Sequence, residues 1–506
     1  MKSDTPHRVR WRLFAVILLV IVGAVGWVWF VRDADSRQDR VLATEGILSG
    51  GGVALLIWLA VLSRLRGRTR VLAGAAVALV AGVFFSAFRY AGVDGDLIPV
   101  FVPRWRTVEL IVTGAPLTGV AMDFPQFGGP GRDGVVTGVA LLRDWEGTPP
   151  SLVWRRPVGG GWSGFAVVGE RAVTHEQHGE EERVVCYELG TGEVVWSRGN
   201  VAGYTSKLAG EGPRATPTIE GGSVFTLGAT GVLSAFDLES GRRSWAIDVI
   251  ADVAGKIPAW GLSGSPLVHG GNVLVGTGAA QGPSLAAYDA ATGARVWAAG
   301  EGSAGYASPR LVTLAGVTQV VVFNNNSVAG HDPSDGRVLW SHPWSARQPN
   351  VAQPLPVGPR RLLVSSGYGI GSELIELTPR VGGGFEVATI WASRRLKSKF
   401  ASMILHDAHV FGLDDGILTC VALATGQRRW KGGRYGHGQL LRVGSDLLVM
   451  AESGDVVLVA LDGDEHREVT RFQAIDGKVW NPPALAGSRL LVRNDQEAAL
   501  FLLPVK

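Results

Sequence analysis

The sequence predicts an all-β, eight-bladed β-propeller with four antiparallel strands per blade, preceded by three transmembrane α-helices. Three observations predict this fold. The N-terminal region contains three apolar stretches, each near the roughly 20 residues that a helix needs to cross a membrane. The remainder repeats a short phrase that ends in an aromatic residue, at an interval of about 45 residues that suits four short strands per blade. The 70 glycines are about twice the share of an average chain, as expected of a fold rich in turns.

The three apolar stretches, at residues 13–31, 46–63 and 71–88, contain no charged side chain. The helices of a soluble bundle usually carry a polar stripe, which these stretches lack. Ionisable groups within a membrane span are the usual mark of an ion or proton path, and none occurs in these stretches. We therefore expect residues 1–90 to be a membrane anchor with three transmembrane helices, followed by a linker and pre-propeller segment at residues 91–150.

The charges that flank these stretches predict how the chain crosses the membrane. Basic residues precede the first stretch and fill the loop between the second and third, where no acid dilutes them: Lys2, Arg8, Arg10 and Arg12, then Arg64, Arg66, Arg68 and Arg70. The loop between the first and second stretches mixes arginine with aspartate. Positive charge favours the cytoplasmic side, so the N-terminus is expected in the cytoplasm. After three crossings of a bacterial inner membrane, the propeller is expected on the periplasmic side.

The repeated phrase begins with a small residue and an acid, passes through Thr-Gly, Ser-Gly or Asp-Gly, and ends at a tryptophan. It predicts a strand, a tight turn in which glycine accepts a positive φ, and a second strand that delivers a large ring between neighbouring blades. Two copies are degenerate, because the copy before Trp391 has a longer turn and the last copy ends at Phe472. Eight structural, blade-docking positions result: Trp154, Trp196, Trp245, Trp297, Trp340, Trp391, Trp430 and Phe472.

Closure of the ring is also predicted, with the propeller at residues 151–506. The sequence after Phe472 is long enough for only three strands of the eighth blade. The missing strand is expected at residues 151–157, SLVWRRP, at the start of the domain. When this N-terminal strand pairs with the C-terminal strands, it completes the last blade and joins the two ends of the ring, which leaves no open sheet edge.

Two stretches carry a resemblance to a known family. The phrase AYDAATGARVW at residues 287–297 resembles the repeat of the pyrroloquinoline-quinone (PQQ) superfamily, and DFPQFGGPGRDG at residues 123–134 looks like the segment that precedes many PQQ-like propellers. The resemblance covers roughly residues 123–506. It implies the propeller fold but leaves the function open, because the superfamily includes quinoprotein alcohol dehydrogenases and also non-enzymatic propellers such as BamB, the lipoprotein of the outer-membrane β-barrel assembly machine.

The resemblance also implies what a quinoprotein enzyme of this superfamily would need. Such enzymes hold calcium or a lanthanide through carboxylates and amides, and they stack the quinone between a tryptophan and a disulfide of adjacent cysteines. Here Cys186 and Cys420 are far apart and favour buried free thiols. We therefore expect no catalytic residues and no cofactor, with PQQ and calcium needed only under the alternative of a PQQ-dependent, quinoprotein dehydrogenase-like enzyme.

Other candidate sites have simpler explanations. His175, Glu176 and His178 match no common closed zinc site and favour a polar hairpin tip. Asp414 and Asp415 resemble a carboxylate pair, but the glycine that follows them favours a strand turn. The sequence therefore predicts no metal site. The net charge of +3 is small, and most clustered arginines flank the apolar stretches, so nothing favours a nucleic-acid partner.

The innermost strands of a propeller converge on a central channel, so the residues at their starts line one rim of the ring. Small residues beside aromatics at these positions are typical of a binding surface. The candidate rim residues are Trp162, Trp260, Tyr306, Lys399, His437, Trp480 and Asn481. Alternatively, these side chains fill the channel or pack blade against blade. As a set they favour a BamB-like, non-catalytic scaffold that binds a protein or peptide partner, or another ligand, outside the membrane.

Overall fold

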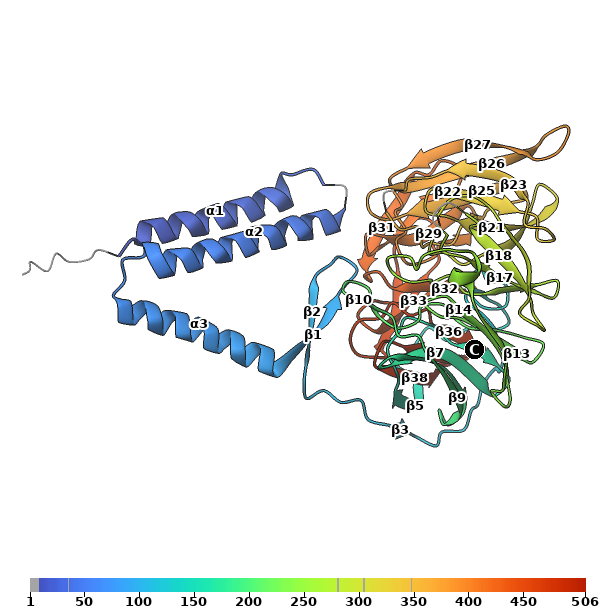
Figure 1. The fold of residues 1–506 in the computed structure, drawn as a ribbon, viewed down its shortest axis with the longest axis horizontal. Coiled ribbons are helices and arrows are strands. Elements are labelled where there is room, and N and C mark those ends of the chain that lie inside the picture. Colours follow the sequence, from blue (N-terminus) through green and yellow to red (C-terminus); the bar gives the residue numbers. More distant parts are fainter. Residues whose placement is uncertain (1–8, 35, 280–281, 304, 347) are drawn as a thin grey trace, which may run out of the picture. The chain divides into compact units, whose positions relative to one another are not determined.

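The computed structural model describes residues 9–34, 36–279, 282–303, 305–346 and 348–506, in two compact units that meet between Thr107 and Val108 (Figure 1). Lys2 and Arg8, which contribute to the predicted orientation, lie outside the described residues. The first unit holds the helices and the second holds the propeller.

Three helices of the first unit are long and apolar enough to span a membrane. They are α1 (Trp11–Phe30), α2 (Arg37–Ile57), which continues into the π-helical turn η1 (Trp58–Leu62), and α3 (Gly67–Ala87). Helix α2 begins earlier than its apolar stretch because Ser36 and Asp39 form a capping box, in which each side chain accepts a hydrogen bond from the backbone N–H of the other residue.

A short hairpin follows α3 directly. Its strands are β1 (Phe88–Val93) and β2 (Pro99–Pro103). The second unit then begins, and its short strand β3 (Ile111–Val112) pairs with β5 (Ser151–Pro157) on the outside of the propeller. Residues between α3 and the propeller thus include ordered strands on both sides of the boundary between the two units.

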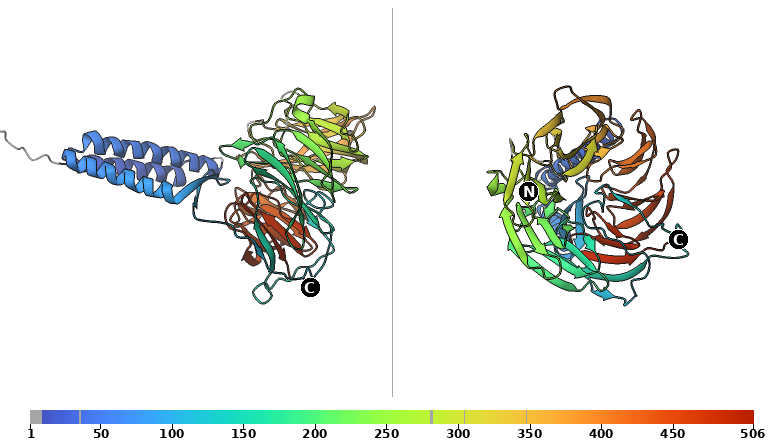
Figure 2. Two further views of the ribbon diagram at one scale, coloured as in Figure 1. Left: turned by 60° about the horizontal axis from the view of Figure 1, so that its bottom comes forward. Right: turned by 90° about the vertical axis from the view of Figure 1, so that its right-hand side faces the viewer.

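The second unit is an eight-bladed propeller, and its blades form a ring (Figure 2, right). Each blade has four antiparallel strands, counted from the centre outward. The first four blades are β6 (Ala166–Val168), β7 (Arg171–His178), β8 (Glu181–Glu188) and β9 (Val194–Val201); β12 (Thr218–Glu220), β13 (Ser223–Leu227), β14 (Val232–Asp237) and β15 (Arg243–Asp248); β16 (Leu267–His269), β17 (Asn272–Gly276), β18 (Leu285–Asp289) and β19 (Arg295–Ala299); and β20 (Arg310–Leu314), β21 (Val317–Phe323), β22 (Ser327–His331) and β23 (Val338–Pro343).

The remaining blades continue the ring in the same way. They are β24 (Leu355–Pro356), β25 (Arg361–Ser366), β26 (Gly371–Pro379) and β27 (Phe385–Ser393); β28 (Ile404–His406), β29 (His409–Asp414), β30 (Ile417–Ala422) and β31 (Arg428–Arg434); β32 (Gln439–Val443), β33 (Asp446–Met450), β34 (Asp455–Ala460) and β35 (Glu468–Gln473); and β36 (Ala484–Ala486), β37 (Arg489–Arg493), β38 (Glu497–Leu502) and β5. Outside this pattern lie β4 (Val135–Val136), the hairpin of β10 (Thr205–Ser206) and β11 (Gly210–Glu211), and the single turn α4 (Val249–Asp252).

The predicted closure is confirmed. Strand β5 pairs antiparallel with β38, with Pro157 opposite Glu497 and Ser151 opposite Leu502. The Arg155 guanidinium lies 2.7 Å from the Glu497 carboxylate and reinforces this pairing between the two ends of the propeller sequence.

The aromatic residue of a phrase packs on the next blade around the ring. The indole N–H of Trp154 donates to the carbonyl of Leu189, 2.8 Å away, and its ring lies on Gly192 in the β8–β9 turn. A Cβ at Gly192 would approach the ring to 2.6 Å, so glycine is needed for this contact as well as for the φ of +69°. The same two contacts recur for Trp196 on Gly241, Trp245 on Gly293 and Trp391 on Gly426.

Four positions differ from this arrangement. The Trp297 ring lies on Gly336, but its indole N–H makes no hydrogen bond among the described residues. The indole N–H of Trp430 donates to the Asp462 carbonyl of the next blade at 2.9 Å, but none of the described glycines lies against its ring. Trp340 turns back onto its own blade, where its indole N–H donates to the Gln319 side chain and its ring lies on Gly330. Phe472 has no N–H to donate, and its ring packs on Phe501 and on Trp145, with centroids 5.0 and 5.5 Å apart.

Residues 123–136, the channel segment, lie at the centre of the ring. Phe124 bridges to Val167 on β6, and β4 pairs parallel with β32. The buried Arg132 guanidinium donates to the carbonyls of Ser265 and Pro309, at 3.0 and 3.1 Å, just before the innermost strands of the third and fourth blades. The segment therefore connects inner strands from several blades.

The channel segment enters from one particular face of the ring. Just before it, the Val120 carbonyl accepts a hydrogen bond from the backbone N–H of Ser488, in the turn between β36 and β37. That turn lies at the end of an inner strand, opposite the connection from the preceding blade. Beside the segment remains a cavity of about 30 Å³, lined by Arg132, Arg310 and Gln439 among others, which has room for one or two waters.

Candidate functional site

The connections that lead from the outer strand of one blade to the inner strand of the next lie on one face of the ring, which we call the rim. All seven candidate residues from the sequence lie in these connections. The rim is opposite the face through which the channel segment enters, because each inner strand runs from the rim to that other face.

One aromatic group lies where the ring closes. The Trp162 and Trp480 rings, from the connections before the first and eighth blades, have centroids 4.8 Å apart. Phe400 packs edge-on against Trp480 at 5.1 Å and against the His437 imidazole at 5.7 Å. Four connections that are far apart in sequence thus contribute to one cluster.

Charged groups border this cluster. The Lys478 ammonium lies 4.2 Å from the Trp480 ring centroid and 4.8 Å from that of Trp162, within the range of a cation–π interaction. Glu452 accepts hydrogen bonds from the Trp480 indole at 2.6 Å and from the His437 backbone N–H at 2.9 Å. The cluster therefore presents half-buried aromatic surface together with one cation and one anion.

Lys399 is buried beside this cluster and makes a second cation–π contact. Its ammonium lies 4.4 Å from the Tyr368 ring and 5.3 Å from the Phe400 ring. Tyr368 lies in the β25–β26 turn with a φ of +57°, a conformation that is unfavourable for a bulky residue. Burial raises the pKa of Tyr368, so its phenol stays protonated.

A second aromatic group borders a hollow on the rim. The Trp260 and Tyr306 rings are 5.6 Å apart and line a cavity of about 380 Å³, together with Lys256, Asn325 and Gln348 among others. The size is within the range of ligand pockets, and the lining joins aromatic rings with amides and one ammonium.

Residues on either side of the β10–β11 hairpin extend this second group. Tyr204, just before β10, donates its hydroxyl to the Ala259 carbonyl, 2.7 Å away. The Arg214 guanidinium lies 4.8 Å from the Tyr204 ring. Burial lowers the pKa of Arg214 to about 10, so it remains charged at neutral pH. An arginine stacked on a tyrosine therefore lies on the same face as Trp260.

The candidate residues differ in what they offer to a ligand. Trp260, Tyr306 and Trp480 are half-buried, whereas Trp162, Lys399, His437 and Asn481 are buried. The Asn481 side-chain amide donates to the carbonyls of Gly161 and Ser163, at 3.1 and 2.9 Å, and joins the last blade to the first. The accessible part of the set is thus centred on Trp260, Tyr306 and Trp480.

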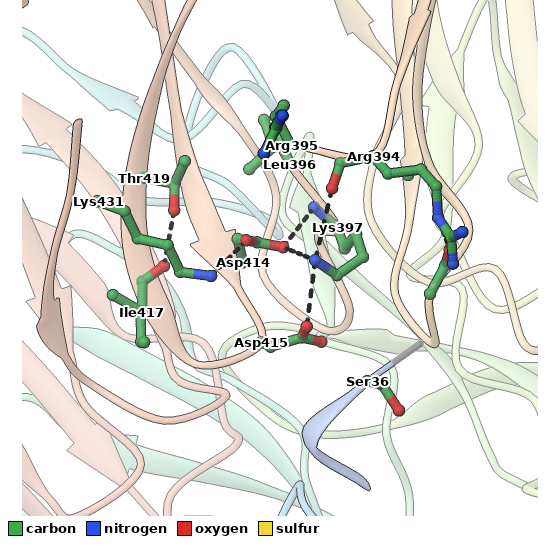
Figure 3. Close-up of polar contacts among 12 residues, drawn as sticks. Ser36, Arg394, Arg395, Leu396, Lys397, Asp414, Asp415, Ile417, Thr419 and Lys431 are labelled. Atoms are coloured by element: carbon green, nitrogen blue, oxygen red, sulfur yellow. Dashed lines mark hydrogen bonds and ion pairs between the residues drawn. The ribbon is translucent and has the colours of Figure 1, made fainter. Parts of the chain in front are cut away.

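A cluster of charges around the buried Asp414 supports the same face in the sixth blade (Figure 3). The Lys397 ammonium lies 2.6 Å from Asp414 and 3.2 Å from Asp415, and Lys431 donates to Asp414 from the other side. Burial alone lowers the pKa of Lys397, but the two aspartates outweigh it and raise the pKa above its ordinary value. Lys397 is therefore a charged partner and not a nucleophilic amine.

Glu176, weighed as a metal ligand, has other partners. Its carboxylate accepts hydrogen bonds from the Tyr187 hydroxyl at 2.6 Å and the Gly159 backbone N–H at 2.8 Å, and it lies 2.9 Å from the His178 ring. The buried Arg493 acts with these hydrogen bonds to lower the pKa of Glu176, although burial alone would raise it. The carboxylate therefore lies within an internal network of the first blade.

Comparison with known proteins gives the family. The family model described as outer membrane protein assembly factor BamB matches residues 148–259 and 180–432, which together span more than half of the chain. This chain belongs to the BamB-like PQQ-repeat family. No curated protein sequence matches this member significantly.

Solved structures agree on the fold of this BamB-like protein. BamB from Moraxella catarrhalis is 16% identical with a TM-score of 0.52, covering 70% of this chain and 100% of that chain. A europium-containing methanol dehydrogenase is 11% identical with a TM-score of 0.55, covering 76% and 98%. A quinohemoprotein alcohol dehydrogenase from Comamonas testosteroni is 14% identical with a TM-score of 0.54, covering 76% and 81%. Identities this low show the fold alone, and the neighbours include both a BamB and enzymes.

The quinoprotein neighbours raise the question of whether this BamB-like rim fits a quinone with calcium. Calcium takes six to eight oxygen ligands, and no three acidic, histidine or cysteine side chains converge as a metal site in the described part of the chain. The buried Asp414 is paired with two lysines. Trp162 and Trp480 lie against each other, which leaves no room for a quinone between them. The residues present do not fit this group, and we derive no step through it.

The cysteines of this family member are free and buried, as predicted. Burial raises the pKa of Cys186 and of Cys420 to about 12, so neither forms a reactive thiolate at neutral pH.

Proposed function

We propose that this protein is a membrane-anchored, extracytoplasmic propeller that binds a protein or peptide partner at its rim and does not catalyse a reaction. The observation that carries the proposal is the 380 Å³ cavity bordered by Trp260 and Tyr306 on the rim. Half-buried tryptophan and tyrosine are the residues that most often dominate the binding energy of protein interfaces.

The lining of this cavity suits a peptide better than an apolar small molecule. Asn325 and Gln348 provide amides that can both donate to and accept from a peptide backbone, and Lys256 adds one positive charge. Trp480 and Lys478 add further amphipathic surface on the same face. A peptide that follows the rim would contact both aromatic groups.

The anchor supports the location. Three helices long enough to span a membrane precede the propeller, and Arg64, Arg66, Arg68 and Arg70 lie between the second and third. Under the positive-inside rule these arginines are cytoplasmic, so the propeller lies on the periplasmic side of a bacterial inner membrane. The partner is then expected to be periplasmic or a membrane protein with periplasmic segments.

The proposal is tested by photo-crosslinking in intact membranes. A benzophenone amino acid replaces Trp260 or Trp480 on the rim, and the matched control replaces the fully exposed Val381 in the β26–β27 turn, on the opposite face. We expect a discrete crosslinked product from the rim positions and not from Val381. Equal products from both faces, or none from the rim, would contradict the proposal.

The alternative function is a PQQ-dependent, quinoprotein dehydrogenase-like enzyme. It is tested because the fold is similar to that of a methanol dehydrogenase. Purified protein is incubated with PQQ and calcium and assayed for dye-linked alcohol oxidation. Under our proposal the rate equals that of protein denatured beforehand. Activity above that background would establish the alternative.

A further inference from the structure

The β1–β2 hairpin continues the last turn of α3 as an aromatic surface. Strand β1 begins at Phe88, the residue after the end of α3. In the register of the hairpin Phe88 is opposite Pro103 and Tyr90 is opposite Phe101. Residues opposite each other share a face of a two-stranded ribbon, so Phe88, Tyr90 and Phe101 lie on one face.

Rings from α3 and from the residues after β2 join this face. Phe84 lies 5.1 Å from Phe88 and 5.0 Å from Phe101, and Trp105 lies 5.8 Å from Phe88. We call Phe84, Phe85, Phe88, Tyr90, Phe101 and Trp105 the aromatic face. It is exposed to an unusual degree, with Phe85 58%, Tyr90 51% and Trp105 68% accessible. A contiguous aromatic surface of this kind marks an interaction site.

Two arginines lie on the hairpin that carries the aromatic face. Arg89 lies between Phe88 and Tyr90 in β1, so its exposed side chain leaves the opposite face of the ribbon. Arg104 donates from its Nε to the Phe85 carbonyl at 3.1 Å and from its backbone N–H to the Ala87 carbonyl at 2.9 Å. These bonds fix the hairpin to the end of α3. Guanidinium groups beside exposed aromatics match the phosphate and upper acyl region of a phospholipid.

The hairpin also lies at the level where the other helices leave the membrane. The Arg37 guanidinium at the start of α2 is 2.8 Å from Asp96, in the turn between β1 and β2. Helix α1 ends at the same side of this unit with exposed Trp27 and Phe30 (Figure 1). At the other end of α1, the rings of Trp11, Phe14 and Trp58 lie together, and the Trp58 indole N–H donates to the Arg10 carbonyl. The helix pair thus has aromatic residues at both ends, as membrane-spanning helices do at the two interfaces.

We propose that the β1–β2 hairpin is a lipid-binding element whose aromatic face lies in the interfacial layer of the leaflet where α3 ends, with Arg89 and Arg104 bound to the phosphates of anionic phospholipids. The occupant is lipid because the aromatic face is continuous with the apolar surface of α3. The inference depends on the membrane anchoring in the proposed function, but not on the rim or its partner.

The depth of the aromatic face in the membrane is measured by fluorescence quenching, with the full chain in lipid nanodiscs. Cys186 and Cys420 are fully buried, so a cysteine introduced by Trp105→Cys reacts selectively with an environment-sensitive dye. Val381→Cys on the propeller is the matched control. The aromatic face is expected roughly 5–10 Å into the interface. A nitroxide near the lipid headgroup should therefore quench the Trp105→Cys dye several-fold more than one at the acyl-chain end, and neither should quench the Val381→Cys dye.

Other occupants give different results. Quenching of the Trp105→Cys dye by aqueous iodide but not by lipid nitroxides would show a surface in water. Protection from both quenchers would show that the propeller or another protein covers the aromatic face. Either result overturns the proposal, and neither depends on crosslinking at the rim.

The contribution of the arginines to lipid binding is measured with the same dye at Trp105→Cys. Its quenching by nitroxide-labelled phosphatidylglycerol is compared with its quenching by nitroxide-labelled phosphatidylcholine, and the ratio gives the preference for the anionic lipid. An arginine near an anionic membrane surface is worth about 1 kcal/mol, so Arg89→Gln and Arg104→Gln should each lower the preference for phosphatidylglycerol about fivefold. Arg104→Lys should retain most of it, and Arg380→Gln, in the propeller, should leave it unchanged. Loss of preference in the Arg380→Gln control, or none in either hairpin variant, would remove the role of the arginines.

Discussion

Two junctions between blades show what the repeated phrase does. At the junction of the eighth and first blades, Trp154 crosses to the next blade, lies on Gly192 and donates to the Leu189 carbonyl. After the fourth blade, Trp340 instead bonds to Gln319 in its own blade. The tryptophan of the repeated phrase therefore usually joins two blades. Whether it crosses to the next blade depends on the residues around it and on the hairpin of that blade.

The reason for the difference is local. The small residue that opens the phrase lies opposite the tryptophan across the strand pair, as Ala235 does for Trp245, and in the fourth blade this residue is Gly330. A Cβ at Gly330 would clash with the Trp340 indole and with Gln319, so glycine permits the inward position. The next blade also differs from the others. The extra residues before Trp391, predicted as a longer turn, instead lengthen β26 and β27, which pair out to Pro379 and Phe385. A Cβ on any glycine of the β26–β27 turn would not meet the Trp340 ring.

The largest effect is expected at the regular junction that closes the ring. Trp154→Ala removes a fully buried ring and leaves the Leu189 carbonyl without its donor, which should cost about 3–5 kcal/mol of unfolding free energy. Urea unfolding of the full chain, followed by fluorescence, measures the loss. Trp105→Ala, at an exposed position, should change stability by less than about 0.5 kcal/mol. Similar losses for both variants would show that Trp154 has no special role in closure.

A buried carboxylate sharpens the comparison at the junction of the first and second blades. Glu182 on β8 accepts a hydrogen bond from the backbone N–H of Ala229 in the second blade, 3.0 Å away. Burial raises the pKa of Glu182 from its ordinary 4.5 to about 7. Between these two values the unfolded chain releases the proton while the folded chain keeps it, so stability falls as the pH rises through this range and stays low above it.

Glu182→Gln should remove this penalty while its amide oxygen still accepts from Ala229. The stability difference between the variant and the parent should be small below about pH 4.5, grow towards pH 7 and level off, reaching at most about 3 kcal/mol. Urea midpoints at a series of pH values measure it. His175, 4.0 Å away, has a pKa lowered to about 3 mainly by burial, and its contribution is common to both proteins. A difference that does not vary with pH would contradict the prediction.

The smallest expected effect is that of adding a Cβ to a glycine. Two glycines allow the cost of contact with a tryptophan ring to be separated from the cost of the left-handed backbone conformation. Gly192 and Gly444 both have a left-handed φ, +69° and +60°, but a Cβ would meet the Trp154 ring at 2.6 Å only at Gly192, and nothing within 4 Å at Gly444. Gly444→Ala should therefore cost about 1–2 kcal/mol from its conformation alone. Gly192→Ala should cost about 1–2 kcal/mol more, because the ring must move. Equal losses in chemical unfolding would mean that the ring moves freely.

Much of the propeller could be predicted from the sequence because its information is local. Each phrase contains its own strand, turn and aromatic residue, so eight positions gave the number of blades, and a shortage of strands after Phe472 located the closing strand. The unusual position of Trp340 could also have been predicted from the sequence. Gly330 stands where the other phrases begin with alanine, cysteine or leucine, and the copy after it is degenerate.

The rim was less predictable because its contacts join residues far apart in sequence. The strand starts indicated Trp162 and Trp480, but not that Lys478 lies over both rings or that Glu452 accepts from Trp480. A usable signal was the uneven interval between phrases. The intervals from Trp196 to Trp245 and from Trp245 to Trp297 are longer than average, and their extra residues form β10, β11, α4 and the wall of the cavity at Trp260.

The channel segment has a consequence for how the propeller can be made and trimmed. It leaves the ribosome before any blade, so the blades assemble around a strand that is already present. A soluble form that began at β5 would lack Arg132, leave the carbonyls of Ser265 and Pro309 facing an empty core and expose Val167 without its bridge to Phe124. The first residue of a separable propeller therefore lies upstream of Val120, whose carbonyl holds the β36–β37 turn.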